Sequence, residues 1–305
     1  MNISRRGFLG YCVISAAALG LEPFDLFKLK SALAKSDAPK VIWLQGSGCA
    51  GCSISFMNRV AASAPGMSVG SLLSDDIDLI YHPTLMAAAG EMAANAALAI
   101  ADSSKYILVV EGGVPTAFSG AAGWAWSLLG EDTTLQRAIT DLGRNASSII
   151  AVGTCASFGG ISASGDNPGG VIPVSQAITN PLSPIVNVPG CPPHPDWIVA
   201  TLVNVILGTI GSTVTLDGYS RPTDIYGEIV HSNCPRQKLP HASTFGVDNQ
   251  CLITLGCVGM ATKAPCPKTK WNSGANWCTE SNAPCLGCTE PTFPDTGDFY
   301  NIPRK

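Results

Sequence analysis

The chain has 305 residues, of which 46% are hydrophobic and 13% are charged, and its formal net charge is −4. This length suits one large domain or two smaller ones, and it allows a core of useful size. The net charge argues against nucleic-acid binding, which needs basic patches. The low charged fraction indicates that much of the surface meets protein rather than water. With 32 glycines, 22 prolines and 12 cysteines, the composition is typical of a loop-rich protein held together by disulfides or by bound metal.

Residues 1–34 predict an export signal. Arg5 and Arg6 stand just before the apolar stretch Phe8–Leu21, which is shorter than the about 20 residues needed to span a bilayer. Ala32–Ala34 then offers a small-residue cleavage site. The paired arginines favour the twin-arginine pathway over an ordinary Sec signal or an N-terminal anchor. Resemblance to that pathway implies a periplasmic protein that is exported folded, and we expect no transmembrane helix in the mature chain.

Residues 35–208 predict an α/β domain. Short apolar runs rich in Val and Ile, typical of buried parallel strands, alternate with helix-compatible patterns. The predicted strands are Val41–Leu44, Ile77–Tyr81, Tyr106–Val110, Ile149–Val152 and Ile185–Val188, and the predicted helices are Leu85–Ala101, Thr133–Asn145 and Asp196–Leu207. This alternation predicts a doubly wound parallel sheet with helices on both faces.

Residues 209–305 predict a second, irregular domain. From Tyr219 onward the chain is rich in Pro, Gly, Asn and Cys and has few periodic apolar stretches. Such a segment cannot bury enough apolar surface to fold alone. It therefore needs internal staples, a partner surface, or both.

Four cysteines follow the ends of predicted strands. Cys49 and Cys52 come after the first strand, Cys155 after the fourth and Cys191 after the fifth. Because ligands of open α/β sheets bind beyond the carboxyl ends of the strands, we expect these thiols to meet at one edge. Four thiolates can ligate a cubane iron–sulfur cluster or a zinc ion. An ordinary buried cysteine at position 155, and a thioredoxin-like redox pair at Cys49 and Cys52, are the alternatives.

The second half carries eight further candidate ligands. Removal of residues 1–34 also removes Cys12 and leaves an odd number of cysteines, which cannot all pair as disulfides within the chain. With one histidine, the remaining cysteines make three sets of four ligands, although structural zinc stays an alternative. The second set combines one imidazole with three thiols, and the third is all thiol: His231, Cys234, Cys251 and Cys257, then Cys266, Cys278, Cys285 and Cys288.

Several motifs in order resemble the small subunit of nickel–iron hydrogenases, and the resemblance covers essentially the whole chain. They are Cys49–Cys52, Gly153–Cys155, Pro189–Pro193, His231–Arg236 and Cys285–Cys288, together with the intervening cysteines and the twin-arginine leader. The resemblance implies a flavodoxin-like first domain and an iron–sulfur relay between the nickel–iron site of a large subunit, where H2 is reversibly oxidised, and an external carrier. It also implies the ligands: proximal Cys49, Cys52, Cys155 and Cys191; distal His231, Cys234, Cys251 and Cys257; medial Cys266, Cys285 and Cys288.

Cys278 departs from the commoner pattern of this family, in which a proline stands there and the medial cluster has three irons. A fourth thiolate lets the corner iron stay, so we expect three 4Fe–4S clusters and a lower medial potential. The replacement resembles the selenium-containing subgroup, whose selenocysteine would lie in the large subunit. One neutral imidazole takes the place of an anionic thiolate at the distal cluster, and this should raise the reduction potential of that cluster.

No further Cys or His set remains to hold nickel, so we expect no catalytic residue on this chain apart from a proton-relay role for Glu111. A subunit-interface role and a solvated loop carboxylate are the alternatives for Glu111, and Arg221 and Arg236 fit either docking or a structural role. The resemblance implies a heterodimer with the large subunit, a c-type cytochrome as electron partner, and any membrane association through a partner. An iron–sulfur adapter of another oxidoreductase and a zinc-stapled interaction protein remain alternatives. The missing adjacent Cys-Cys pair and the eight additional ligands speak against the adapter, and zinc without acid-labile sulfide would indicate the staple.

Overall fold

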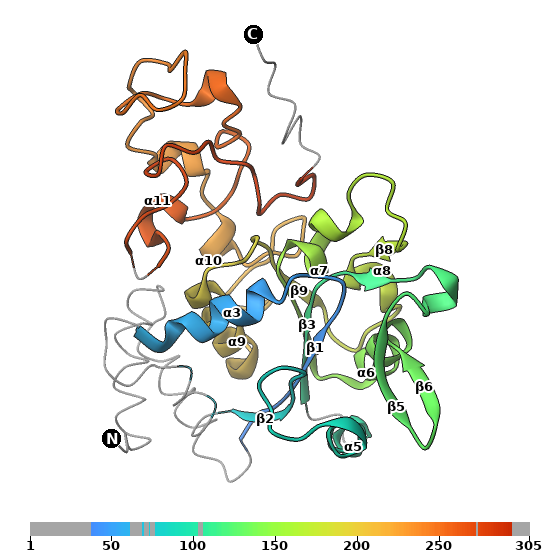
Figure 1. Cartoon of the computed structure of the whole chain (residues 1–305). Coiled ribbons are helices and arrows are strands. Elements are labelled where there is room, and N and C mark those ends of the chain that lie inside the picture. Colours follow the sequence, from blue (N-terminus) through green and yellow to red (C-terminus); the bar gives the residue numbers. More distant parts are fainter. Residues whose placement is uncertain are drawn as a thin grey trace.

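The computed structural model describes residues 38–61, 69, 73, 77–102, 106–272 and 274–294. The predicted signal at residues 1–34 lies outside these residues. Among the described helices, none has the length and apolar character needed to cross a membrane. An α/β half carries an irregular segment at one end of its sheet (Figure 1).

Five parallel strands form the central sheet, in the order β2-β1-β3-β7-β9. Counted among the parallel strands alone, this is the 2-1-3-4-5 order of flavodoxin-like folds. The strands are β1 (Lys40–Gln45), β2 (Asp78–Tyr81), β3 (Tyr106–Glu111), β7 (Ser148–Val152) and β9 (Ile185–Val188). All five strands predicted from the sequence are confirmed.

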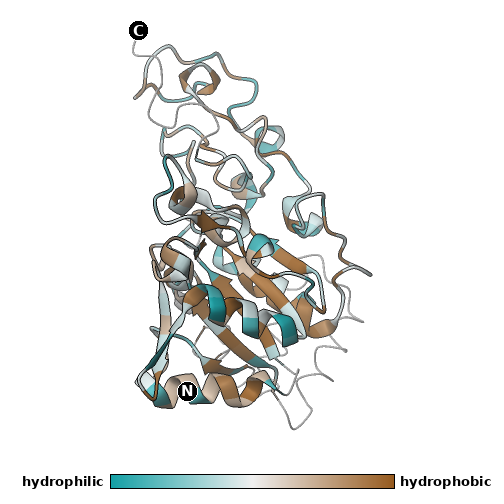
Figure 2. Ribbon diagram, turned by 90° about the vertical axis from the view of Figure 1, so that its right-hand side faces the viewer, coloured by the Kyte–Doolittle hydropathy of each residue, from teal (hydrophilic) through white to brown (hydrophobic). Residues whose placement is uncertain are grey.

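Helices cover both faces of the sheet, as predicted. Alternate strand residues point to opposite sides, so Trp43 joins one core cluster and Leu44 the other. The first cluster is closed by α3 (Gly51–Met57) and α9 (Pro195–Leu207), and the second by α5 (Gly90–Ala101) and α6 (Leu135–Asn145). Figure 2 shows the hydrophobic residues concentrated on the strands between these two helical layers.

The helix starts differ from the predictions for local reasons. The helix predicted from Leu85 begins only at Gly90, whose φ of +57° lies outside the helical region. Thr133 belongs to a strand, and Thr134 is the N-cap of α6, its side chain accepting a hydrogen bond from the N–H of Arg137 at 3.2 Å. The helix predicted at Asp196–Leu207 is confirmed to within one residue.

The remaining elements are short. Two small antiparallel pairs, β4–β8 and β5–β6, flank the main sheet. In the first half they and the short helices are η1 (Asn58–Ala61), β4 (Val114–Pro115), η3 (Phe118–Gly120), β5 (Trp124–Leu128), β6 (Glu131–Thr134), α7 (Thr154–Phe158), η4 (Gly160–Ala163), β8 (Val171–Ile172) and α8 (Val174–Ala177).

After α9 the chain is irregular, as predicted. Its described helices are single turns: α10 (Thr223–Tyr226), η5 (Val230–Asn233), η6 (Ile253–Leu255) and α11 (Cys266–Thr269). The Tyr226 hydroxyl donates to the Pro189 carbonyl at 2.8 Å, and the Asn187 amide donates to the Tyr219 carbonyl at 2.8 Å. These contacts tie the segment to the loop and strand that precede Cys191.

The two arginines left open by the sequence make contacts within the chain. Arg221 is buried and pairs with Asp217 and Glu290 at 2.8 Å and 3.0 Å. Arg236 donates to the side chain of Asn282 at 2.6 Å and to the carbonyl of Gln250 at 3.2 Å. Both side chains therefore connect segments that are distant in the sequence.

Candidate metal centres

The four strand-end cysteines lie together at the carboxyl edge of the sheet. Cys49 lies just before α3 and Cys52 in its first turn, Cys155 lies in α7, and Cys191 follows β9. Burial raises the pKa of the Cys52 thiol well above its usual value, and the charges of Glu111 and of the other three thiols raise it further. The pKa of Cys191 is raised to about 11, mainly by burial and then by the charges of Cys155 and Cys49. The convergence expected at this edge is therefore present.

Glycine backbone forms the wall against which these thiols pack. A Cβ atom at Gly153 would lie only 2.4 Å from the sulfur of Cys52, and the φ of this glycine is +88°. A Cβ atom at Gly51 would lie 3.0 Å from the sulfur of Cys49. A side chain at position 153 would thus occupy space that the proximal thiol needs, in a backbone conformation that favours glycine.

The medial cysteines are also brought together. Cys266 lies at the start of α11. Burial is the largest cause of its raised pKa, and the charges of Cys288, Cys285 and Cys278 add to it. The pKa of Cys288 rises to about 12 through burial, with smaller contributions from Cys285, Cys278 and Cys191. The four medial thiols therefore lie near one another, and beyond burial the charge of Cys257 in the distal set also raises the pKa values of Cys278 and Cys285.

The proposed proximal and medial sets meet at Thr154. The Thr154 hydroxyl donates to the carbonyl of Cys288 and accepts from the N–H of Gly190 at 2.9 Å. The N–H of Cys191 also donates to Cys288 and holds the pKa of that thiol lower than burial alone would. One buried threonine and one backbone amide thus join the two groups.

The three distal thiols lie near one another, close to η5, which contains the backbone of His231. Cys234 follows His231 within one turn, its N–H donating to the His231 carbonyl at 3.1 Å. Burial is the main cause of the raised pKa of Cys257, and Cys234 and Cys251 add to it. The N–H of Cys285 donates to the sulfur of Cys257 at 3.4 Å, so the distal and medial groups adjoin.

The donor chemistry fits clusters of iron and sulfide. All eleven cysteines in the described part of the chain are free thiols, so the disulfide alternative is wrong there. Soft thiolates are the usual ligands of iron–sulfur clusters, and a bound cation offsets the repulsion that raises these pKa values. Within the described residues, no three His, Cys, Asp or Glu side chains converge closely enough for a single metal ion. A cubane binds each thiolate through a different iron and accepts a wider spacing. The ligand assignments stay a prediction.

Glu111 is the last residue of β3 and is buried, so the solvated-loop interpretation is wrong. Its carboxylate accepts hydrogen bonds from the N–H groups of Cys52 and Ser53, at 2.9 Å and 3.1 Å. The indole of Trp43 donates to it at 3.1 Å. Sequence reasoning missed Trp43, Ser53 and His82, although His82 directly follows β2 and could have been found by the rule of strand ends.

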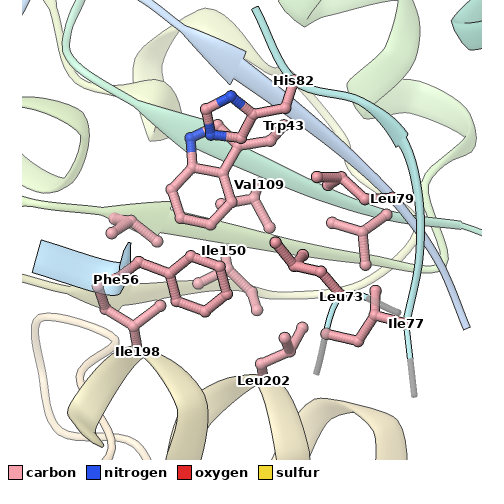
Figure 3. A pocket seen from close by; sticks show the side chains of 12 residues that line it. Trp43, Phe56, Leu73, Ile77, Leu79, His82, Val109, Ile150, Ile198 and Leu202 are labelled. Carbon is pink, nitrogen blue, oxygen red and sulfur yellow. The ribbon is translucent and has the colours of Figure 1, made fainter. Parts of the chain in front are cut away.

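His82 and Trp43 lie at one end of a small pocket whose other walls are apolar (Figure 3). Their ring centroids are 5.2 Å apart. Burial lowers the pKa of His82 to about 4, although the charge of Glu111 acts in the opposite direction. The imidazole is therefore neutral at pH 7.

Two family models match the chain. Residues 49–205 match the family described as NADH ubiquinone oxidoreductase, 20 Kd subunit. Residues 226–301 match the family that describes the C-terminal part of the NiFe/NiFeSe hydrogenase small subunit. The first match covers the four strand-end cysteines and most of the sheet, and the second covers the other eight candidate ligands.

Similar proteins align over nearly the full length. The periplasmic NiFeSe hydrogenase small subunit of Desulfomicrobium baculatum is 38% identical over 98% of this chain and 99% of its own. The periplasmic NiFe hydrogenase small subunit 1 of Nitratidesulfovibrio vulgaris is 37% identical over 98% of this chain and 93% of its own. The recombinant NiFeSe hydrogenase structure from Desulfovibrio vulgaris Hildenborough matches with a TM-score of 0.76 and 37% identity, over 86% of this chain and 96% of that one.

Proposed function

Because this chain belongs to the small-subunit family of nickel–iron and nickel–iron–selenium hydrogenases, we propose that its three ligand sets hold three 4Fe–4S clusters. As an electron-transfer subunit it serves the hydrogenase reaction, whose catalytic metals belong to a large subunit. The observation that carries the proposal is the grouping of the free thiols into three adjoining sets. When bound, such clusters accept and release one electron at a time.

The residues of this chain hold the relay in place. Cys49, Cys52, Cys155 and Cys191 would bind the proximal cluster, Cys266, Cys278, Cys285 and Cys288 the medial one, and His231, Cys234, Cys251 and Cys257 the distal one. The proposed division into a flavodoxin-like domain at 35–208 and an iron–sulfur domain at 209–305 is supported by the left-handed Gly208 that ends α9. The hydrogen bonds of Thr154 with Cys288 and of Cys285 with Cys257 support the adjacency of the three sets.

The large subunit would cover the proximal edge. Cys49 and Cys191 are exposed, and so are the apolar side chains of Ile54 on α3 and Ile161 on η4. Exposed apolar surface beside a functional group is typical of an interaction site. A proton-relay role for Glu111 would also belong to this edge.

The electron partner would be a c-type cytochrome at the distal end, and the location the periplasm. Twin-arginine export is supported by Arg5 and Arg6, and the periplasmic location by similarity to the periplasmic small subunits of Desulfomicrobium baculatum and Nitratidesulfovibrio vulgaris. Any membrane association would come through a partner.

The proposal is tested by metal analysis and EPR of the purified heterodimer. Three cubanes require about twelve irons and about twelve acid-labile sulfides on the small subunit, beyond the iron of the large subunit. We expect no oxidised three-iron signal from the wild type and a strong one from Cys278→Pro, with about one iron fewer. Zinc without sulfide would overturn the relay, and a strong three-iron signal in the wild type would overturn the role of Cys278 alone.

A further inference from the structure

The carboxylate of Glu111 is only 2% exposed, and it accepts five hydrogen bonds. The donors are the indole of Trp43, the amide of Gln45, the N–H groups of Cys52 and Ser53, and the hydroxyl of Ser53. Every one of these partners is a hydrogen-bond donor. An ionised carboxyl is a pure acceptor and suits this arrangement, whereas a protonated one would place a donor among donors.

The hydrogen bonds that connect Thr84, His82 and Ser53 to Glu111 all donate toward the carboxylate. The N–H of Thr84 donates to Nδ1 of His82 at 3.2 Å, which assigns the ring proton of the neutral imidazole to Nε2. Nε2 lies 3.1 Å from the Ser53 hydroxyl and donates to it, and that hydroxyl donates to Glu111. His82 and Ser53 therefore orient their donors toward the carboxylate.

The charge lies next to the proximal thiols. Two of the five donors are the backbone amides of Cys52 and of the residue after it, so the carboxylate lies directly behind a candidate ligand. After burial, Glu111 is the next largest cause of the raised pKa of the Cys52 thiol, ahead of the other three cysteines. Electrostatics between groups in such a buried setting are screened much less than at the surface.

We propose that Glu111 is a fixed buried anion that lowers the reduction potential of the proximal cluster, with Ser53 and His82 as positioning residues. A negative charge behind a cluster ligand opposes the arrival of an electron, and charge and hydrogen bonding around such a cluster set its potential. The proposal rests on the proposed function, namely a cluster held by Cys49, Cys52, Cys155 and Cys191. This role is an alternative to the proton relay, which would need the carboxylate to gain and lose a proton.

The test is a redox titration of the heterodimer followed by the EPR signal of each cluster. Glu111→Gln removes the charge with little change of shape. We expect the proximal midpoint potential to rise by at least a tenfold change in the one-electron equilibrium, which is about 59 mV. The medial and distal potentials should stay unchanged. Glu111→Asp keeps the charge and should stay closer to the wild type.

A second variant predicts the opposite sign. Ser53→Ala removes one donor, leaves the carboxylate charge less compensated, and should lower the proximal potential. A merely structural role would not give shifts of opposite sign in these two variants. If Glu111→Gln fails to assemble the proximal cluster, the Ser53→Ala titration decides alone. Glu91→Gln, at an exposed position of α5, is the matched control and should shift nothing.

Potentials that do not move, or that move equally in all three clusters, would overturn the proposal while leaving the relay intact. Failure of the proposed function looks different. In that case the wild-type heterodimer itself would lack the iron, the sulfide and the proximal signal.

Discussion

At the scale of single residues, His82 links pH to stability. Its folded pKa is lowered from the usual 6.5 to about 4, by burial against the weaker opposing effect of Glu111. Between pH 6.5 and 4 the unfolded chain therefore binds a proton that the folded chain does not. The free energy of unfolding should fall as the pH drops through this window.

Replacing His82 with glutamine, which cannot titrate, should remove this dependence. The difference between wild type and His82→Gln should grow by up to about 3 kcal/mol between pH 7 and pH 4. Urea denaturation of both proteins at several pH values in this range measures it. Parallel pH profiles would contradict the assignment.

The sequence could place the thiols but not the surroundings of Glu111. Cys49, Cys155 and Cys191 follow strands that their Val and Ile content makes recognisable, and strand ends of a parallel sheet share an edge. The indole of Trp43 reaches the carboxylate across 68 positions of the sequence. No local pattern encodes such a contact, since it depends on β1 and β3 being neighbours in register.

At the scale of elements, the turn between β7 and α7 depends on a residue without a side chain. We expect Gly153→Ala to displace the Cys52 thiol, because the added Cβ would lie 2.4 Å from its sulfur. The protein should lose about four irons, those of the proximal cluster. Iron analysis and the proximal EPR signal measure this loss.

Gly165→Ala is a matched control. Gly165 also has a positive φ, +63°, but no atom lies within 4 Å of the position that a Cβ would take there, so both variants carry backbone strain and only one meets a thiol. Gly165→Ala should lower stability by about 1 kcal/mol and keep its full iron content. Equal iron loss in both variants would show that strain alone is responsible.

The β5–β6 hairpin was not predicted, and its turn explains why. Leu129 and Gly130 both have positive φ, 52° and 83°. Two-residue hairpin turns of this kind favour Asn-Gly or Asp-Gly, and leucine gives no such signal. Main-sheet strands, in contrast, were found because burial on both faces leaves continuous apolar runs.

At the scale of the whole molecule, Arg221 holds the irregular segment together. It is 1% exposed, and besides Asp217 and Glu290 it donates to the carbonyl of Thr289 at 2.9 Å. Arg221→Met would leave two carboxylates without their buried cation. We expect a loss of about 3–5 kcal/mol in the free energy of unfolding, together with loss of medial iron, because Thr289 follows Cys288.

Arg137→Met gives the comparison. Arg137 is 74% exposed and pairs with Asp141 at 3.4 Å on the surface of α6, so its loss should change stability by less than about 1 kcal/mol. Denaturation midpoints and iron content of the two variants measure the contrast. Similarly small effects in the two variants would show that the Arg221 contacts do not hold the irregular segment together.

The hydroxyl of Thr154 has a consequence for how charge could cross the protein. Thr154 is the covalent neighbour of Cys155, and its hydroxyl donates to the carbonyl of Cys288. A tunnelling route between those two cysteines therefore follows covalent bonds except for one short jump through a hydrogen bond. Valine at this position would keep the shape of the side chain and break the only polar step of that route.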